Sequence, residues 1–325
     1  MLLVQAGASG TRPRQEASPT ASPACAETFR IGFVADVAGL GSSIDAAGWR
    51  GVNDALREIS CVRADLALPS RPSEYRRLLQ AHAGYDLVIA GSFLLADAIV
   101  EIAWANPATH FVLVDPIVMP PDVPNLAVLT FRSDQGAFLA GALAAMVTRT
   151  GVVAGVYGPQ GAIDIANRLG FENGARYVRP SVSVLGAYQP AGGKPYADPT
   201  WGADQARAFV RERADVIFAT GGTTGQGALF GATQSGVVCI SADIGASSEA
   251  SCSLANSTKD INRGIAMTVA EAIAGQWHGG VRSLGLAQRA VGLSLSADPR
   301  LTSEIRDRLR AISDLLAAGA LTTGA

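Results

Sequence analysis

Short apolar runs alternate with segments of helical periodicity along most of the chain, and this alternation strongly constrains its fold. The first unit begins with the run RIGFVA at 30–35, continues through a Gly/Ser stretch, and ends in helical spacing up to Leu56. Further strands are predicted near 62–67, 86–90, 110–114, 126–131, 152–157, 181–187, 215–219 and 237–242. Helices are predicted over 72–82, 93–105, 135–148, 162–177, 201–213, 226–234, 259–275 and 303–317.

Strands that alternate with helices form right-handed βαβ units, so an α/β fold with parallel sheets covered by helices is expected. The chain has 325 residues, of which 48% are hydrophobic, so it can bury a sizeable core. More than eight predicted strands fit two doubly wound lobes better than one sheet. A barrel of eight such units is a competing fold on spacing alone.

Charge and composition exclude several classes of protein. The 26 basic and 28 acidic residues give a net charge of -2, which argues against nucleic-acid binding and against a polybasic membrane patch. Because the sequence contains no run of eighteen apolar residues, no membrane-spanning helix is expected. The three histidines and four cysteines show no zinc-ligand spacing, so no metal site is predicted.

Motifs that would indicate an enzyme are incomplete. The segment Gly39-Leu40-Gly41 resembles the start of a dinucleotide fingerprint, but Ile44 stands where the third glycine belongs. The segment 221–227 lacks the lysine of a phosphate-binding loop, and there is no Gly-x-Ser-x-Gly elbow. We therefore predict no catalytic residue and no cofactor.

Acidic and glycine-rich residues follow the predicted strands. They are Asp36, Asp115 and Asp243, with the segments 91–93 (GSF) and 220–225 (TGGTTG). Ligands of open parallel sheets bind beyond the carboxyl ends of the strands. Each of these residues alone could cap a helix or form a turn. Together they predict a polar cleft, rich in hydrogen-bond acceptors, that suits hydroxyl groups.

Residues 1–28 are predicted to lie outside the fold. The apolar stub 1–8 ends in small residues, as a signal segment does, although it lacks a positive start and an ordinary frayed terminus is the alternative. The Pro-, Ser-, Thr- and Ala-rich stretch 10–23 is typical of a flexible tether. Cys25 follows a poor lipobox, so lipid attachment there is a weak hypothesis.

Several strings together resemble the basic membrane protein family, the nucleoside-binding lipoproteins that serve ABC transporters. They agree in order and spacing from about residue 30 to the last predicted helix. The strings are DVAGL at 36–40, GWRG at 48–51, YDLVI at 85–89, LLADA at 94–98, GAFLAG at 136–141, DPTWG at 198–202, ADVIF at 214–218, GGTTGQG at 221–227 and STK at 257–259.

The resemblance implies a type I periplasmic binding protein: two Rossmann-like doubly wound lobes joined by a hinge of three crossover strands. It places 29–133 plus 244–280 in the first lobe and 134–243 plus 281–320 in the second. It also implies an extracytoplasmic monomer, tethered only through its N-terminus, that delivers a purine nucleoside to an ABC permease and catalyses nothing. A signalling receptor with the same fold and a nucleoside-processing enzyme are the alternatives.

The resemblance also implies which residues contact the ligand. Asp36 and Asp115 would line the cleft, Asp243 would bind the ribose hydroxyls, and Gly222 would let the backbone approach. Lys259 would reach the sugar or base, unless it is a surface lysine that opens a helix. Ser92 and Phe93 complete the predicted set at the end of the third strand. Tyr196 would hold the position of an aromatic ring that stacks on the base, with Tyr188 as the competing residue.

Two departures from the family pattern affect these expectations. A phenylalanine–asparagine pair of the family, at the ligand, reads Ile44-Asp45 here. Ile44 is expected to pack on a ring of the ligand, although it cannot stack on it as phenylalanine would. If Asp45 faces the base, its carboxylate suits the two neighbouring donors of guanine better than adenine. A second acid common after the ribose aspartate is replaced by Gly245, which weakens the sugar assignment.

The four cysteines suggest two disulfides. Cys239 and Cys252 bracket the turn of Asp243, and Cys25 and Cys61 precede two strands that would be neighbours. Such bridges are typical of an extracytoplasmic protein, and buried free thiols are the alternative.

Overall fold

The first of two sheets is entirely parallel. The computed structural model describes residues 28–59, 61–242 and 251–325. The first sheet contains β1 (Phe29–Val34), β2 (Val62–Ala67), β3 (Leu87–Ala90), β4 (His110–Val114), β5 (Leu126–Phe131) and β11 (Gly280–Leu284). Its strand order is β11-β5-β4-β3-β1-β2, and each neighbouring pair is parallel.

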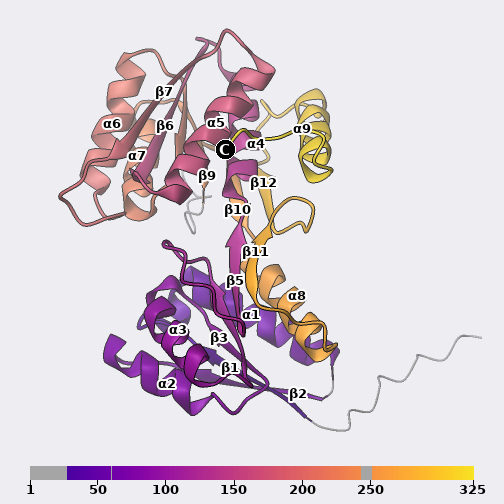
Figure 1. The fold of residues 1–325 in the computed structure, drawn as a ribbon. Helices are drawn as coiled ribbons and strands as arrows, with labels where there is room; N and C mark the ends of the chain where they lie inside the picture. Colours follow the sequence, from indigo (N-terminus) through magenta and orange to yellow (C-terminus); the bar gives the residue numbers. More distant parts are fainter. Residues whose placement is uncertain (1–27, 60, 243–250) are drawn as a thin grey trace, which may run out of the picture.

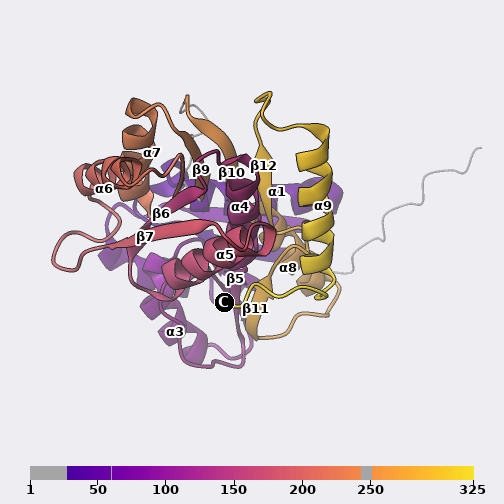
Figure 2. The same ribbon diagram turned by 90° about the horizontal axis from the view of Figure 1, so that it is seen from above.

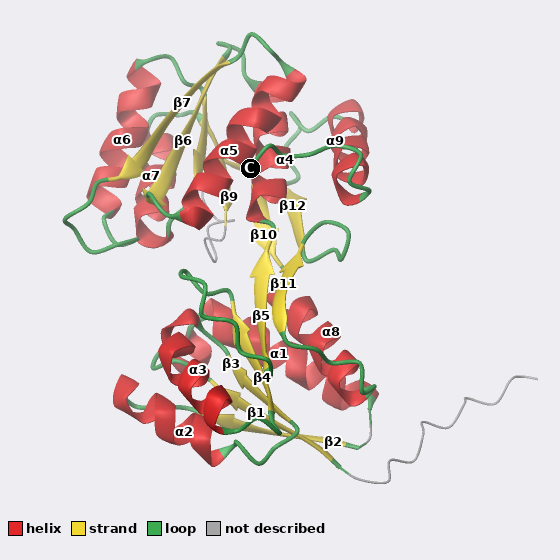
Figure 3. Ribbon diagram, viewed as in Figure 1, coloured by secondary structure: helices red, strands yellow, loops and turns green. Residues whose placement is uncertain are grey.

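The second sheet repeats this design with one antiparallel edge. It contains β6 (Val152–Pro159), β7 (Ser183–Gln189), β8 (Val216–Ala219), β9 (Val238–Ala242), β10 (Ser253–Lys259) and β12 (Val291–Leu295). Its order is β12-β10-β9-β8-β6-β7, in which β12 runs antiparallel to β10. Two open sheets exclude the barrel, and the predicted doubly wound α/β class is confirmed (Figure 3).

Helices cover both sheets. The first lobe carries α1 (Ser43–Glu58), α2 (Tyr75–Ala81), α3 (Ala96–Ala105), α8 (Ile261–Ile273) and the short 3-10 turns η1 (Gly39–Gly41), η2 (Pro72–Glu74) and η3 (Phe93–Leu95). The second lobe carries α4 (Ser133–Val147), α5 (Ala162–Val178), α6 (Pro199–Arg211), α7 (Gly222–Gln234) and α9 (Ser303–Ala317). In Figure 2, α9 lies on one flank of the second lobe and α6 on the opposite flank.

The strand period of two explains why each sheet has two cores. Ile31 and Phe33 of β1 belong to the cluster that includes Val52 of α1 and Ile265 of α8. Their neighbour Val34 faces the opposite cluster, which includes α2 and α3. Alternate side chains of a strand point to opposite faces, so helices are needed on both.

The chain passes between the lobes three times, as predicted, but two of the crossings lie at other residues than the predicted lobe boundaries. The crossings lie between β5 and α4, between β10 and α8, and between β11 and β12 (Figure 1). Residues 253–259 therefore belong to the second sheet, although the prediction placed 244–280 in the first lobe. Residues 280–284 belong to the first sheet, although the prediction began the second lobe's last segment at 281. The reason is that β10 pairs with β9 before the chain crosses.

Two further predictions differ at element boundaries. The strands β10, β11 and β12 were not predicted, and Lys259 ends β10 instead of opening a helix. The glycine-rich segment after β8 was expected to be a loop, but α7 begins at Gly222. Gly221 and Gly222 have φ of +93° and +62°, a backbone conformation that only glycine adopts readily, and this permits the sharp turn into the helix.

A disulfide joins Cys239 of β9 to Cys252, the residue before β10, with Cα atoms 5.1 Å apart. Cys61 is also disulfide-bonded, and its predicted partner Cys25 lies outside the described residues. We expect the double variant Cys239→Ala/Cys252→Ala to lose about 2 to 3 kcal/mol of unfolding free energy, because the bridge restricts the unfolded chain. Urea denaturation without reductant, compared with the wild type, measures this loss. Equal midpoints and slopes for the two proteins would contradict it.

Candidate functional site

A cavity of about 280 Å³ lies where the first lobe meets the end of β10. Its wall combines the start of α1, the residue after β4, and the crossing from β10 to α8. The lining residues are Ser43, Ile44, Ala47, Arg50, Asp115, Asn256, Ser257, Thr258, Lys259 and Ile261. Three residues predicted from the sequence therefore line one cavity: Ile44, Asp115 and Lys259.

Two residues of the cavity wall form an ion pair. Lys259 Nζ donates to Asp115 Oδ2 at 3.1 Å, and the two side chains are only 11% and 13% exposed. Asp115 directly follows β4 of the first sheet, and Lys259 ends β10 of the second. Largely buried charges depend on their partners, so removing Lys259 would leave the Asp115 carboxylate without this cation. The pair thus places one anionic acceptor and one cationic donor, from different sheets, beside the same space.

Tyr196 lies on the second lobe, and its backbone is fixed in an unusual conformation. Its φ of +61° is in the left-handed region. Its amide donates to Gln189 Oε1 at 2.9 Å, and its carbonyl accepts from the amide of Thr223 at 3.0 Å. A Cβ at Gly158 would come within 2.5 Å of the ring, so Gly158 gives the ring the space it occupies.

The hydroxyl of Tyr196 also has a defined partner. It donates to Oδ2 of the buried Asp164 at 3.2 Å. Burial raises the pKa of Tyr196 to about 12, the charge and hydrogen bond of Asp164 add to the shift, and the positive charge of Lys259 opposes it. Tyr196 is not among the residues that line the cavity of Asp115 and Lys259. The competing Tyr188 packs against Tyr157 and Arg168 instead, at ring-centroid distances of 5.6 Å and 5.0 Å.

Gly222 lies beside Tyr196. A Cβ at Gly222 would approach the Tyr196 carbonyl oxygen to 2.9 Å and its Cβ to 3.3 Å. The start of α7 and the segment that carries Tyr196 thus pack closely because the helix opens with glycine. The sequence did not single out Asp164 or Gln189, which hold Tyr196 in place, whereas Thr223 lies in the predicted glycine-rich segment 220–225.

Asp45 does not reach the cavity. Its side chain is fully buried, and Oδ2 accepts a hydrogen bond from the Asp36 amide at 3.1 Å. Burial raises the pKa of Asp45 to about 7; the Asp36 amide opposes this shift, and the negative charge of Asp36 adds to it. The hypothesis that Asp45 faces the base of a ligand is therefore not supported by its position. Asp36 is 6% exposed and accepts from the Ala38 amide at 2.7 Å, which fixes the turn after β1.

Ser92 and Phe93 lie apart from this cavity. Ser92 is buried, and its hydroxyl accepts from the Leu94 amide at the start of η3. Phe93 lines a separate groove beneath the segment 116–121. The predicted ligand residue Asp243 and its neighbour Gly245 lie outside the described residues.

The cavity also contains residues that the sequence did not assign to a site. Arg50 is exposed on α1, and Asn256 lies on a strand that was not predicted. Within the described ranges, no group of three or more His, Cys, Asp or Glu is arranged to hold a metal ion. In the same ranges, no helix combines the length and apolar character needed to span a bilayer.

Comparison with known proteins gives a consistent result. The family described as ABC transporter substrate-binding protein PnrA-like matches residues 57–314. Basic membrane protein B of Borreliella burgdorferi is 30% identical over 220 residues, which cover 65% of this chain and 63% of that protein. Basic membrane protein A of the same organism is 32% identical over 148 residues, covering 45% and 42%. The matched part thus spans less than two thirds of these relatives.

Solved structures share the fold. A solute-binding protein of an ABC transporter system from Conexibacter woesei superposes with a TM-score of 0.72 at 19% identity, covering 91% of this chain and 98% of that one. One from Aeropyrum pernix gives 0.69 at 18% identity, covering 90% and 92%. With the family match over most of the chain, these results lead to one conclusion. The chain belongs to the basic membrane protein family of PnrA-like ABC transporter substrate-binding proteins.

Proposed function

We propose that this chain is the extracytoplasmic binding component of an ABC transporter, that it captures a purine nucleoside between its lobes, and that it delivers this ligand to the permease. The observation that carries the proposal is the Asp115–Lys259 ion pair beside the cavity, because its two members come from different sheets. A ligand bound there would contact both lobes at once. Contacts of this kind favour a closed arrangement over an open one.

The chemistry of the site suits a sugar and a flat heterocycle. A carboxylate such as Asp115 accepts hydrogen bonds from ribose hydroxyls, and the ammonium group of Lys259 donates to sugar or base oxygens. The ring of Tyr196 is proposed to stack on the base, an interaction worth about 1–3 kcal/mol. Asp36, Ile44, Gly222 and Asp243 are kept as proposed contacts on the strength of family resemblance.

The proposed location follows from the cysteines. The Cys239–Cys252 disulfide is typical of oxidising compartments outside the cytoplasm. We propose that residues 1–28 tether a monomeric receptor to the membrane and that the permease is its protein partner. The described strands and helices begin at Phe29.

Calorimetric titration tests the ligand assignment. We expect guanosine and adenosine to bind with a stoichiometry near one. The 2′-deoxynucleosides should bind at least about tenfold more weakly, because a carboxylate of the site would lose the hydrogen bond that the ribose 2′-hydroxyl donates. Chromatography of the mixture should recover the intact nucleoside. Release of free base would show an enzyme, and binding of sugars but no nucleoside would overturn the ligand class. Uptake of labelled nucleoside by cells with and without the protein separates transport from sensing.

The two lysines of the chain provide a matched pair of variants. We expect Lys259→Met to weaken nucleoside binding at least about tenfold, since it removes a charge-assisted donor and leaves Asp115 uncompensated. Lys194→Met is the control, because that side chain is exposed and lies away from the cavity. Equal affinities for the two variants would contradict the role of Lys259.

A further inference from the structure

The first turn of α4 lies where the three crossings meet. Arg132 precedes α4, and its amide donates to the carbonyl of Leu284 at 2.8 Å. The Leu286 amide in turn donates to Gln135 Oε1 at 2.8 Å. These two bonds join the first crossing to the third. Gly136 packs so closely on Ser257 of β10 that a Cβ there would overlap the serine hydroxyl.

The second crossing is tied to the third as well. The Asp260 amide, between β10 and α8, donates to the carbonyl of Ala290 at 2.8 Å. A Cβ at Gly285 would come within 2.5 Å of Gln135 Oε1, so this part of the third crossing also packs on α4. Any change in the angle between the lobes must therefore be accommodated around residues 132–136, which we call the pivot.

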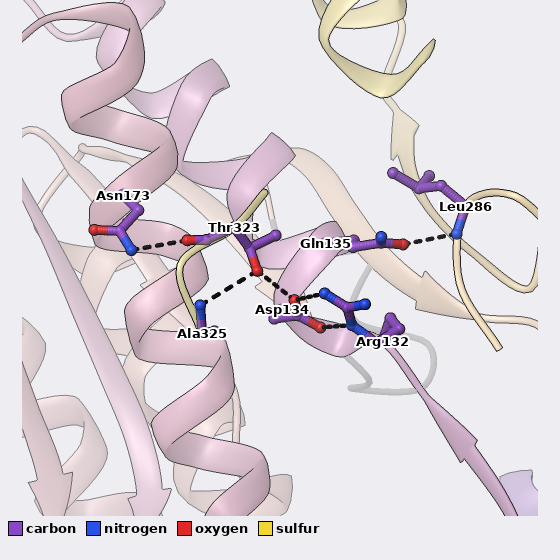
Figure 4. A network of polar contacts seen from close by, with 7 residues as sticks. All are labelled: Arg132, Asp134, Gln135, Asn173, Leu286, Thr323 and Ala325. Atoms are coloured by element: carbon purple, nitrogen blue, oxygen red, sulfur yellow. Dashed lines mark hydrogen bonds and ion pairs between the residues drawn. The ribbon is translucent and has the colours of Figure 1, made fainter. Parts of the chain in front are cut away.

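The segment that follows α9 binds this pivot. Thr323 is 2% exposed, and its hydroxyl donates to Oδ2 of the buried Asp134 at 2.6 Å (Figure 4). Arg132 donates to both carboxylate oxygens of Asp134, at 2.9 Å and 2.7 Å. Asn173 of α5 donates to the Thr323 carbonyl at 2.8 Å. Thr323 thus completes the hydrogen bonds of the carboxylate that holds Arg132.

We infer that residues 318–325 act as a latch on the hinge, with Thr323 holding Asp134 and Arg132 in the arrangement that fixes the pivot. Loss of the Thr323 hydroxyl would leave Asp134 with Arg132 as its one side-chain hydrogen-bond partner among the described residues and would admit water to a buried carboxylate. The pivot would then open more often, and the range of lobe orientations would increase. This inference does not depend on the identity of the ligand.

Hydrogen exchange of the full chain, without ligand, tests the latch. Thr323→Val keeps the shape and removes the hydroxyl. We expect the rate of amide exchange to rise about tenfold at residues 132–136, the size expected for the loss of one hydrogen bond to a charged group. The Leu286 amide, which bonds to Gln135 and not to Thr323, should show the same rise. Small-angle scattering should show a broader distribution of lobe-to-lobe distances.

Neighbouring residues supply the controls. Thr322→Val changes an exposed threonine of the same segment and should leave exchange at the pivot unchanged. Thr323→Ser retains the hydroxyl and should behave as the wild type. If Thr323→Val does not fold, Asn173→Ala releases the same segment from α5 and should give the same pattern. Faster exchange confined to residues 318–325, with the pivot and the scattering unchanged, would overturn the inference.

Discussion

Replacing Asp45 with asparagine is expected to make the protein more stable at pH 8 and to flatten the pH dependence of its stability. The wild-type carboxyl is fully buried, its Oδ1 has no hydrogen-bond partner among the described residues, and Asp36 lies next to it. An ionised group in that position is costly because it is removed from bulk solvent and lies beside the negative charge of Asp36. Asparagine keeps the shape and the acceptor for the Asp36 amide but carries no charge.

The direction of the effect follows from proton linkage. The pKa of Asp45 is raised from 3.8 to about 7, so the folded protein holds a proton that the unfolded chain has released. Wild-type stability should therefore fall, by roughly a few kcal/mol, as the pH rises from about 4 to about 7. Above about pH 7 both states are ionised, and this contribution becomes constant. The asparagine variant lacks the contribution at every pH.

Urea denaturation of both proteins at several pH values between about 4 and 8 measures the difference. Its slope against pH is informative, since the other titrating groups are common to both proteins. Asp122→Asn, which alters an exposed carboxylate in the segment between β4 and β5, is the matched control and should produce no such slope. Parallel pH curves for Asp45→Asn and the wild type would show that Asp45 is ionised in the folded protein throughout.

The sequence predicts most of the strands because they are buried on both faces. β3 and β8 are continuous apolar runs with no exposed residue, and both were predicted to within one residue. β10, β11 and β12 were missed for the opposite reason. β10 reads SLANSTK and β11 reads GVRSL, so neither an apolar run nor a clean alternation marks these two strands. β12 does alternate, as VGLSL, but it is a short edge strand with half-exposed residues and was overlooked. Their absence from the prediction also shifted the lobe boundaries.

Site residues were predictable where a strand end or the family resemblance marked them. Asp115 follows a buried strand, Lys259 belongs to a matched string, and both line the cavity; their contact with a ligand stays a prediction. The prediction that Asp45 faces a ligand does not fit its position. A carboxylate is expected to face solvent or a ligand, whereas Asp45 is buried beneath the turn after β1. The hinge contacts could not be predicted, since Asp134 and Thr323 are 189 residues apart and neither belongs to a recognised motif.

Replacing Gly174 with alanine is expected to lower the free energy of unfolding by about 4 kcal/mol, although alanine favours a helix over glycine by about 1 kcal/mol. α4 and α5 cross in close contact, and a Cβ at Gly174 would overlap the Phe138 carbonyl oxygen of α4. The obstacle is helix backbone, which cannot turn aside as a flexible side chain can. Overpacking a core usually costs about 1–3 kcal/mol, and a rigid obstacle raises that cost.

The same crossing positions the pivot, so the effect of Gly174→Ala should extend beyond stability. Gly170, one turn earlier on α5, packs against the Asp134 carbonyl, and moving α5 away from α4 would displace Asp134 from Thr323. Chemical denaturation measures the loss of stability, and hydrogen exchange at residues 132–136 measures the displacement. Gly84→Ala is the control, because a Cβ there meets no atom within 4 Å. If Gly174→Ala were as stable as that control, α4 and α5 could not approach as closely as described. The conclusion that this crossing holds residues 132–136 in position would then also be contradicted.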